Sequence, residues 1–229
     1  LYRQVYDAVL RRLADAVWQP GQMLPSEGRL AAELGVSQGT VRKALDALTA
    51  DRLLVRRQGR GTFVAEHNDV QDMFRFFKLR PDSEIAVAPE SRVVSSEEAR
   101  ANANERERLQ LAPGARVVRI QRVRSLDDRV CVAETISVPA ALFPGLSKTT
   151  LPNALYGLYA QYFGITIAVA KECLKAIALK PTEAALLGVS AGTPALEVDR
   201  IAFDLEERPV EWRFSICLTD AQHYESVLR

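Results

Sequence analysis

Two arginines and a glutamate in the second half of the chain could bind a small anion. Arg122 and Arg124 lie in the apolar run 115–126, and Glu134 lies in the run 130–138. Side chains alternate between the faces of a strand, so both arginines share a mostly apolar face, as does the glutamate. A buried charge is costly unless it is paired. Glu134 can neutralise one arginine, and the other guanidinium then needs a carboxylate or phosphate ligand.

The connection between these two runs decides whether the charges meet. A loop of odd length around Asp127-Asp128-Arg129 puts both faces on one side of the sheet and sets Arg122 opposite Glu134. A two-residue turn would set the faces on opposite sides. A shared site therefore requires the odd loop. The alternative, an exposed ladder of charges at the end of a strand, fits the pattern equally well.

A second cationic cluster lies nearer the N-terminus. The segment Arg56-Arg57-Gln58-Gly59-Arg60-Gly61 separates two short β-rich runs, 53–55 and 62–64. This pattern predicts a hairpin with a cationic tip, whose arginines can pair with DNA phosphates or enter a narrow minor groove. An arginine-rich loop alone is more often solvated surface.

Helical patterns precede this hairpin. Tyr2 to about Val17 predicts an amphipathic helix. Ser26 caps a second helix that Gly35 ends, and Ser37 caps a third. The third helix has one apolar stripe, made of Val41, Ala44, Leu45 and Leu48. Two helices joined at a glycine, the second with a small polar start, indicate a helix-turn-helix that reads the major groove.

The distribution of charge agrees with a DNA-binding N-terminal region. The 229 residues have a net charge of only +1. Residues 1–66 hold ten Lys or Arg against seven Asp or Glu, whereas the remainder holds 20 against 22. The apolar content of 48% is typical of a globular protein. No run of 18 apolar residues predicts a membrane span, and we expect a cytoplasmic protein.

The sequence offers no pattern for a metal or cofactor. Cys131, Cys173 and Cys217 lie in apolar segments, so we expect packed, reduced thiols. His67 and His223 have no neighbours at metal-ligand spacing. We expect no metal site, no cofactor and no catalytic residue.

The stretch PGQMLPSEGRLAAELGVSQGTVRKALDALTADRLLVRRQGRGTFV resembles the winged helix-turn-helix of the GntR family of bacterial transcription regulators. The resemblance runs from about Tyr2 to Val64. It implies DNA contacts from the second helix, the recognition helix and the wing, namely Arg29, Ser37, Gln38, Gly39, Thr40, Arg42, Lys43, Arg57, Arg60 and Gly61. The family often has Arg where Gly28 stands and commonly has Arg where Gln38 stands. Gln pairs with adenine while Arg prefers guanine, so the usual operator bases of the family do not carry over to this chain.

The remaining sequence predicts an α+β domain. Residues 67–72 are short and polar and predict a linker between a DNA-binding domain (1–66) and a second domain (73–229). Strands are predicted near 85–94, 115–126, 130–138, 165–179, 194–205 and 209–218. Helices are predicted from Ser96 to about Arg108, from Thr149 to Phe163 and from Pro181 to Leu187. This pattern indicates an antiparallel sheet with helices on one side.

The segments RIQRVRSLDDRVCVAETISVPAALFPGL, LYGLYAQYFGITI and ERPVEWRFSICLTDAQHY resemble the UTRA effector-binding domain of HutC-type GntR regulators. The resemblance covers roughly 73–224 and implies the chorismate lyase fold. It assigns Arg122, Arg124, Glu134 and Glu211 to the ligand pocket. Relatives often have Ser where Ala154 stands and tyrosines where Ile216 and Cys217 stand. The lost hydroxyls disfavour a phosphosugar ligand.

These observations predict a sequence-specific DNA-binding transcription regulator. The resemblance implies a homodimeric repressor on a palindromic double-stranded operator, controlled by a small anionic metabolite. The alternative is a lyase-like enzyme that uses the C-terminal domain. A third reading is a constitutive architectural DNA-binding protein without a ligand. The sequence shows no Ser/His/Asp set or phosphate-binding loop, so we expect no enzyme activity.

Overall fold

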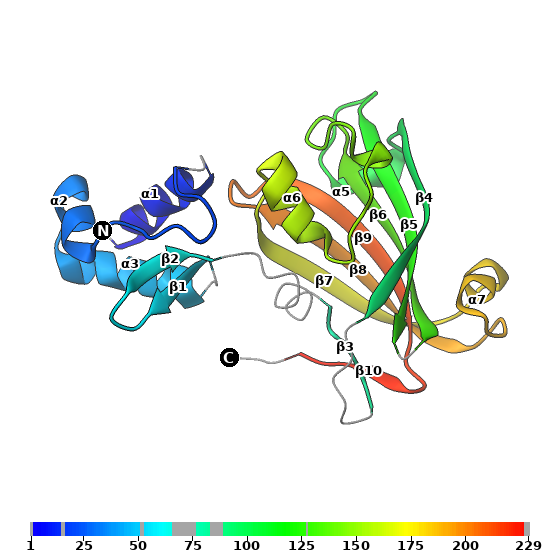
Figure 1. Cartoon of the computed structure of the whole chain (residues 1–229). Coiled ribbons are helices and arrows are strands. Elements are labelled where there is room, and N and C mark those ends of the chain that lie inside the picture. The colour runs from blue at the N-terminus through cyan, green and yellow to red at the C-terminus, as the bar shows by residue number, and fades with distance from the viewer. Residues whose placement is uncertain are drawn as a thin grey trace.

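The computed structural model of the chain describes residues 2–14, 17–50, 53–65, 77–82, 89–126 and 128–226 (Figure 1). Helices and a small hairpin make up the N-terminal region, and a large antiparallel sheet makes up the C-terminal region. The mixed α+β class predicted from the sequence is confirmed. The predicted linker 67–72 lies outside the described residues, as does His67.

Three helices and a hairpin pack around one apolar core in the N-terminal region. They are α1 (Tyr2–Ala14), α2 (Glu27–Leu34), α3 (Gln38–Ala50), β1 (Leu54–Arg57) and β2 (Gly61–Val64). Both predicted caps form, because the N–H of Arg29 donates to Ser26 Oγ and the N–H of Thr40 donates to Ser37 Oγ. Gly35 ends α2 in the left-handed conformation, as expected. The predicted apolar stripe of α3 is buried in the core.

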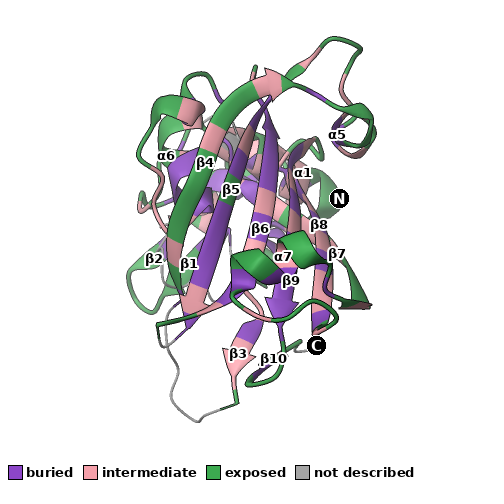
Figure 2. Ribbon diagram, turned by 90° about the vertical axis from the view of Figure 1, so that its right-hand side faces the viewer, coloured by how far each residue is buried: buried purple, intermediate pink, exposed green. Residues whose placement is uncertain are grey.

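The C-terminal region is built on a six-stranded antiparallel sheet with the order β4-β5-β6-β9-β8-β7. The inner strands are mostly buried, whereas the edge strand β4 is largely exposed (Figure 2). Two further short strands, β3 and β10, pair antiparallel in a sheet of their own. In the chain, β3 precedes the six strands of the large sheet and β10 follows them. The bounds are β3 (Leu79–Pro81), β4 (Glu90–Arg100), β5 (Arg116–Leu126), β6 (Arg129–Pro139), β7 (Ile167–Ala178), β8 (Pro194–Asp204), β9 (Pro209–Leu218) and β10 (Gln222–Tyr224).

A β-bulge sets the register of the β5–β6 hairpin. Arg122 pairs with Glu134, as predicted, but the predicted odd-length loop is wrong. Leu126 pairs with Arg129, so two residues connect the strands. The register shifts by one residue at Cys131, which is left without an opposite partner, and this extra residue restores the parity that a two-residue turn would lose.

Helices cover both faces of the sheet, so the prediction of helices on one side is wrong. Helix α6 (Leu155–Phe163) packs on the face that carries Ile120 and Ile136. Helix α7 (Pro181–Leu187) packs with Phe214 and Ile216 on the opposite face (Figure 2). The remaining helices are α5 (Ala103–Arg108) and the 3-10 turn η1 (Leu146–Lys148).

Several predicted element bounds are also wrong. The helix predicted from Ser96 is strand as far as Arg100, because β4 pairs along its length with β5. Its helical part begins only at Ala103, where Asn102 and Glu105 form a capping box. Helix α6 starts at Leu155 rather than Thr149, and α1 ends at Ala14 rather than near Val17. No helix of the described residues is long and apolar enough to cross a membrane.

Candidate functional site

The start of α3 presents small and polar side chains to solvent. The Ser37 hydroxyl caps the helix and also lies 2.9 Å from the Thr40 hydroxyl. Gln38, Gly39, Arg42 and Lys43 are exposed, whereas the opposite stripe of α3 is buried. The Lys43 ammonium lies 4.7 Å from the centre of the Tyr2 ring, which holds this cation against α1. The N-terminal turn of α3 is therefore free to meet base edges.

A single carboxylate ties α2 to α3 and β1. Glu27 accepts hydrogen bonds from Arg42 Nε at 2.9 Å and from Arg56 Nη1 at 3.0 Å. Arg56 also pairs with Asp46 of α3 at 2.8 Å. The hydrogen bond from Arg42 is the main reason that the pKa of Glu27 is lowered, against the opposing effect of burial. The sequence patterns did not reveal this cluster, because its members belong to three different elements.

The wing is the hairpin formed by β1, β2 and the turn between them. The wing and the start of α2 enclose a groove of about 670 Å³. The wing turn requires glycine, since Gly59 and Gly61 have φ angles of 69° and 113°. The Arg57 guanidinium stacks over the Phe63 ring at 4.7 Å. Of the residues predicted to bind DNA, Gln38, Arg57, Arg60 and Gly61 line this groove. The others, Arg29, Ser37, Gly39, Thr40, Arg42 and Lys43, lie on α2 or around the start of α3 and are exposed or half-buried.

Gly28 leaves room for the side chain of Gln38. A Cβ atom at position 28 would lie 2.7 Å from Gln38 Nε2, which is closer than real Cβ atoms approach. The two departures from the family pattern, at positions 28 and 38, are therefore in direct contact. A larger residue at 28 would force the Gln38 amide to move.

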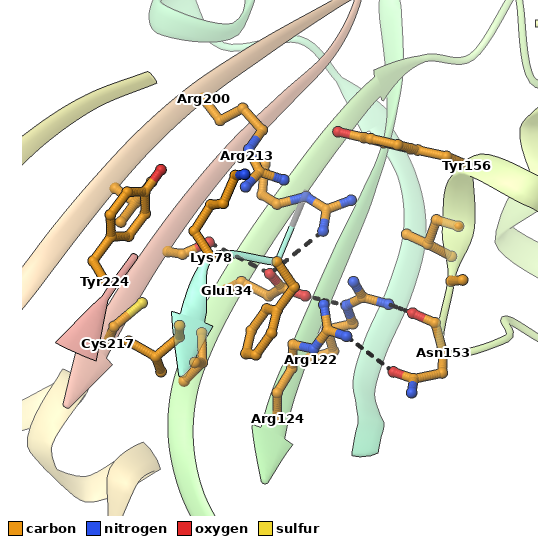
Figure 3. A pocket seen from close by; sticks show the side chains of 17 residues that line it. Lys78, Arg122, Arg124, Glu134, Asn153, Tyr156, Arg200, Arg213, Cys217 and Tyr224 are labelled. Atoms are coloured by element: carbon orange, nitrogen blue, oxygen red, sulfur yellow. Dashed lines mark hydrogen bonds and ion pairs between the residues drawn. The ribbon is translucent and has the colours of Figure 1, made fainter. Parts of the chain in front are cut away.

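In the sheet domain, Arg122 and Glu134 form a buried ion pair (Figure 3). Arg122 Nη1 also donates to the backbone carbonyl of Asn153 at 3.0 Å. The second oxygen of Glu134 lies 3.6 Å from Arg213 Nη1. Burial alone would raise the pKa of Glu134, but the charges of Arg122, Arg213 and Arg124 hold that pKa well below its usual range. The prediction that Glu134 neutralises one of the two arginines is confirmed, and that arginine is Arg122.

Arg124, the second arginine predicted to bind the ligand, has a different environment. Arg124 is 3% exposed, and no carboxylate of the described residues forms an ion pair with it. Its Nη2 donates to Asn153 Oδ1 at 3.1 Å, and its guanidinium stacks on the Phe77 ring at 4.4 Å. Its Nε is buried and has no hydrogen-bond partner among the described residues. Burial lowers the pKa of Arg124 to about 9, although Glu134 opposes this shift.

Glu211 lies behind the pocket rather than on its wall. It is fully buried and accepts hydrogen bonds at 2.9 Å from the hydroxyls of Tyr156 and Tyr159. Arg213 Nε and Nη2 donate to the same carboxylate, also at 2.9 Å. Glu211 thus fixes Arg213 and Tyr156, which do line the cavity (Figure 3). The expected alternation is confirmed, because Trp212 and Phe214 pack on the other face.

A cavity of about 60 Å³ opens between the central strands, α6 and β3. Of the predicted ligand residues, Arg122, Arg124 and Glu134 line it. Helix α6 starts at its wall, and Ala154 at the N-cap provides no side-chain hydrogen bond to the helix. The positive end of the α6 dipole at this wall favours an anion. Seven further polar residues line the cavity and were not assigned to it from the sequence: Lys78, Asn153, Tyr156, Arg200, Arg213, Ser215 and Tyr224.

The cysteines are all free, but their environments differ. Cys131 and Cys217 are buried, as expected, and burial raises the pKa of Cys131 to about 11. Cys173 is exposed on β7, which corrects the expectation that all three are packed. Within the described residues, no group of three potential metal ligands lies together.

Two family patterns match the chain. The bacterial regulatory proteins of the gntR family match over residues 1–64, and the UTRA domain matches over residues 86–223. The chain belongs to the GntR family of bacterial transcription regulators that carry a UTRA domain.

Relatives and solved structures agree with this assignment. The chain is 31% identical over 223 residues to the mannosyl-D-glycerate transport/metabolism system repressor MngR of Escherichia coli, covering 96% of this chain and 92% of the relative. It is 31% identical over 204 residues to the histidine utilization repressor of Pseudomonas putida, covering 87% of this chain and 81% of the relative. The crystal structure of PhnF from Mycobacterium smegmatis matches with a TM-score of 0.59 and 26% identity, covering 98% and 99% of the two chains. The first two are named repressors and the PhnF structure shares the fold, so the lyase alternative is not favoured.

Proposed function

We propose that this GntR-family protein is a homodimeric repressor that binds a palindromic operator and is controlled by a small anion in the UTRA domain. The observation that carries the proposal is Arg124, a cavity-lining residue whose buried guanidinium has no ion-pair partner and whose Nε has no hydrogen-bond partner among the described residues. A buried cation of this kind is costly for the ligand-free fold, and an anionic ligand removes the cost. The relatives named as repressors support the direction of regulation.

In the DNA-binding region, each residue has a role that follows from its exposure. Gln38 at the tip of α3 reads a base edge, since Gln can bond bidentately to adenine. Arg42 and the wing arginines Arg57 and Arg60 contact phosphates and fix the register of the helix. Two such heads related by a two-fold axis require an operator with inverted half-sites.

The test separates DNA binding from ligand control. An operator is first selected from random duplexes with the full-length chain, and binding is then followed by fluorescence anisotropy. We expect an inverted-repeat sequence and release of this duplex by one or a few anionic metabolites from a screened library. Loss of release in Arg124→Gln, with operator affinity unchanged, would agree with the assigned pocket. Selection of no sequence, or equal release of wild type and Arg124→Gln, would refute the proposal.

A further inference from the structure

The acceptors around the cavity are already committed to partners in the protein. Glu134 accepts from Arg122 and lies near Arg213, and the Ser215 hydroxyl donates to the same carboxylate at 3.4 Å. The Tyr156 hydroxyl donates to Glu211, and the Tyr224 hydroxyl donates to Glu172. These bonds take up part of the acceptor capacity at the cavity, so a ligand with many hydroxyl groups gains less there than an anion does.

Asn153 is committed in the same way. Its backbone carbonyl accepts from Arg122, and its side-chain oxygen accepts from Arg124. Lys78 also lines the cavity, but an ammonium can only donate hydrogen bonds. Five cationic side chains, Lys78 and four arginines, line the cavity against one carboxylate, Glu134, and this excess favours an anion over a neutral sugar.

The remaining wall of the cavity is apolar. Its side chains come from the N-terminal end of β3, from three central strands and from α6, namely Phe77, Leu79, Val132, Leu155, Val198 and Cys217. Most of these residues belong to one buried cluster. Such a surface binds a hydrocarbon or aromatic body and gains nothing from a hydroxyl-rich one.

The guanidinium of Arg124 has the geometry for a carboxylate. Its nitrogens lie in one plane and can donate to two carboxylate oxygens, although Nε is buried and Nη2 already donates to Asn153. One face of the guanidinium is covered by the Phe77 ring, so a ligand approaches in the plane of the guanidinium. The charges of Arg122, Arg213 and Arg200 have carboxylate partners in Glu134, Glu211 and Glu172.

The cavity is small, at about 60 Å³, and this favours a compact ligand.

We propose that the effector is a compact aromatic or unsaturated carboxylate. Its carboxylate binds the Arg124 guanidinium, and its body packs against Phe77, Val132, Val198 and Cys217. This inference rests on the proposed function for the location of the site, and it adds the chemical class of the ligand.

The test compares two probe classes on the full-length chain. Benzoate and 2-furoate represent the carboxylate class, and glucose 6-phosphate and inorganic phosphate represent the phosphorylated class. Binding is measured by calorimetry and by the shift in melting temperature, for wild type and for Arg124→Gln. Arg116→Gln is the matched control, because Arg116 lies on the same strand but pairs with Glu98 at the surface.

We expect at least one carboxylate probe to bind wild type and Arg116→Gln equally and to bind Arg124→Gln about 10- to 150-fold more weakly. Val198→Thr, which adds a hydroxyl at nearly constant volume, should weaken the same probe and keeps the test independent of Arg124. Binding of glucose 6-phosphate through Arg124, without carboxylate binding, would overturn the ligand class and leave anion control intact. Binding of none of the probes would overturn the class as well. Carboxylate binding without any effect on the operator complex would refute the proposed function and leave the ligand class standing.

Discussion

The two regions of this protein use arginine in opposite ways. In the N-terminal region, Arg42 and Arg56 are exposed or nearly so and share Glu27 as a partner. In the sheet domain, Arg122 and Arg124 are 2% and 3% exposed, and within the described part of the chain only Arg122 has a carboxylate partner. Exposed cations suit a polyanion, because many weak and salt-sensitive contacts add up along a duplex. A buried cation suits one small ligand, because a single dehydrated contact is strong and selective.

This contrast shows where mutation should cost stability and where it should cost only binding. Surface ion pairs contribute about 0–1 kcal/mol, whereas breaking a buried pair costs about 3–5 kcal/mol. Variants of the sheet domain should therefore change folding and ligand control, and variants of the N-terminal region should change DNA affinity while the fold remains.

The largest effect is expected for Glu134→Gln. This change leaves Arg122 buried without its counter-charge, and it should lower the free energy of unfolding by about 3–5 kcal/mol. Chemical denaturation of the full-length protein measures the change. Glu98→Gln is the control, since Glu98 pairs with Arg116 at the surface and its loss should cost less than about 1 kcal/mol. Equal losses of unfolding free energy in both variants would contradict the expected difference between buried and surface ion pairs.

In the absence of ligand, Arg124→Met should raise the free energy of unfolding rather than lower it. Replacing an unpaired buried cation by an apolar side chain should stabilise the fold by about 1–4 kcal/mol. Burial lowers the pKa of Arg124 to about 9, below its ordinary value. The buried charge of Arg124 therefore destabilises the folded state fully below about pH 9 and less at higher pH. The gain should therefore be full near neutral pH and shrink as the pH rises above about 9. Denaturation at pH 7 and pH 10 tests this, and a destabilised Arg124→Met would show that the guanidinium supports the fold.

Gln38→Ala should relax base selectivity at one position in each half-site. The expected loss of discrimination is about 1–3 kcal/mol, the value of one good bidentate contact to a base. Binding to a randomised operator library measures the selectivity. Gly28→Ala is a finer probe, because the added methyl would displace the Gln38 amide without removing it. An unchanged preference in both variants would exclude Gln38 from base reading.

The smallest effect is expected for Arg42→Ala. If Arg42 contacts one phosphate, the slope of log affinity against log salt should decrease by about 0.9 in magnitude, with base preference unchanged. Anisotropy titrations between low and moderate salt measure the slope. Arg11→Ala is a control on α1, outside the residues assigned to DNA. A slope equal to that of wild type would remove Arg42 from the phosphate contacts.

Local sequence patterns were enough to predict the N-terminal region. The caps at Ser26 and Ser37 and the stripe from Val41 to Leu48 depend on residues within two helical turns. The helix predicted over 96–108 failed for the opposite reason. Its residues favour a helix locally, but the pairing of β4 with β5 outweighs that preference as far as Arg100.

The pocket could be predicted only in part. The sequence could predict Arg122, Arg124 and Glu134 as pocket residues, because they lie on two strands joined by a short turn. Phe77, Asn153 and Arg213 come from segments far apart in sequence, and no spacing rule connects them to β5. The alternation of Glu211 and Arg213 on β9 was visible in the sequence and could have indicated that both face the site. Which of them touches the cavity depends on the depth at which each is buried.

The extra residue in the β5–β6 hairpin constrains how this gene can change. Deleting Cys131 would remove the bulge and leave Arg124 opposite Val132 and Arg122 opposite Glu134, so one residue can be lost here without inverting β6. A second deletion would find no unpaired residue to remove, and it would turn Glu134 toward the face that α7 covers. Any further loss between Arg124 and Glu134 should therefore persist only together with a compensating one-residue change.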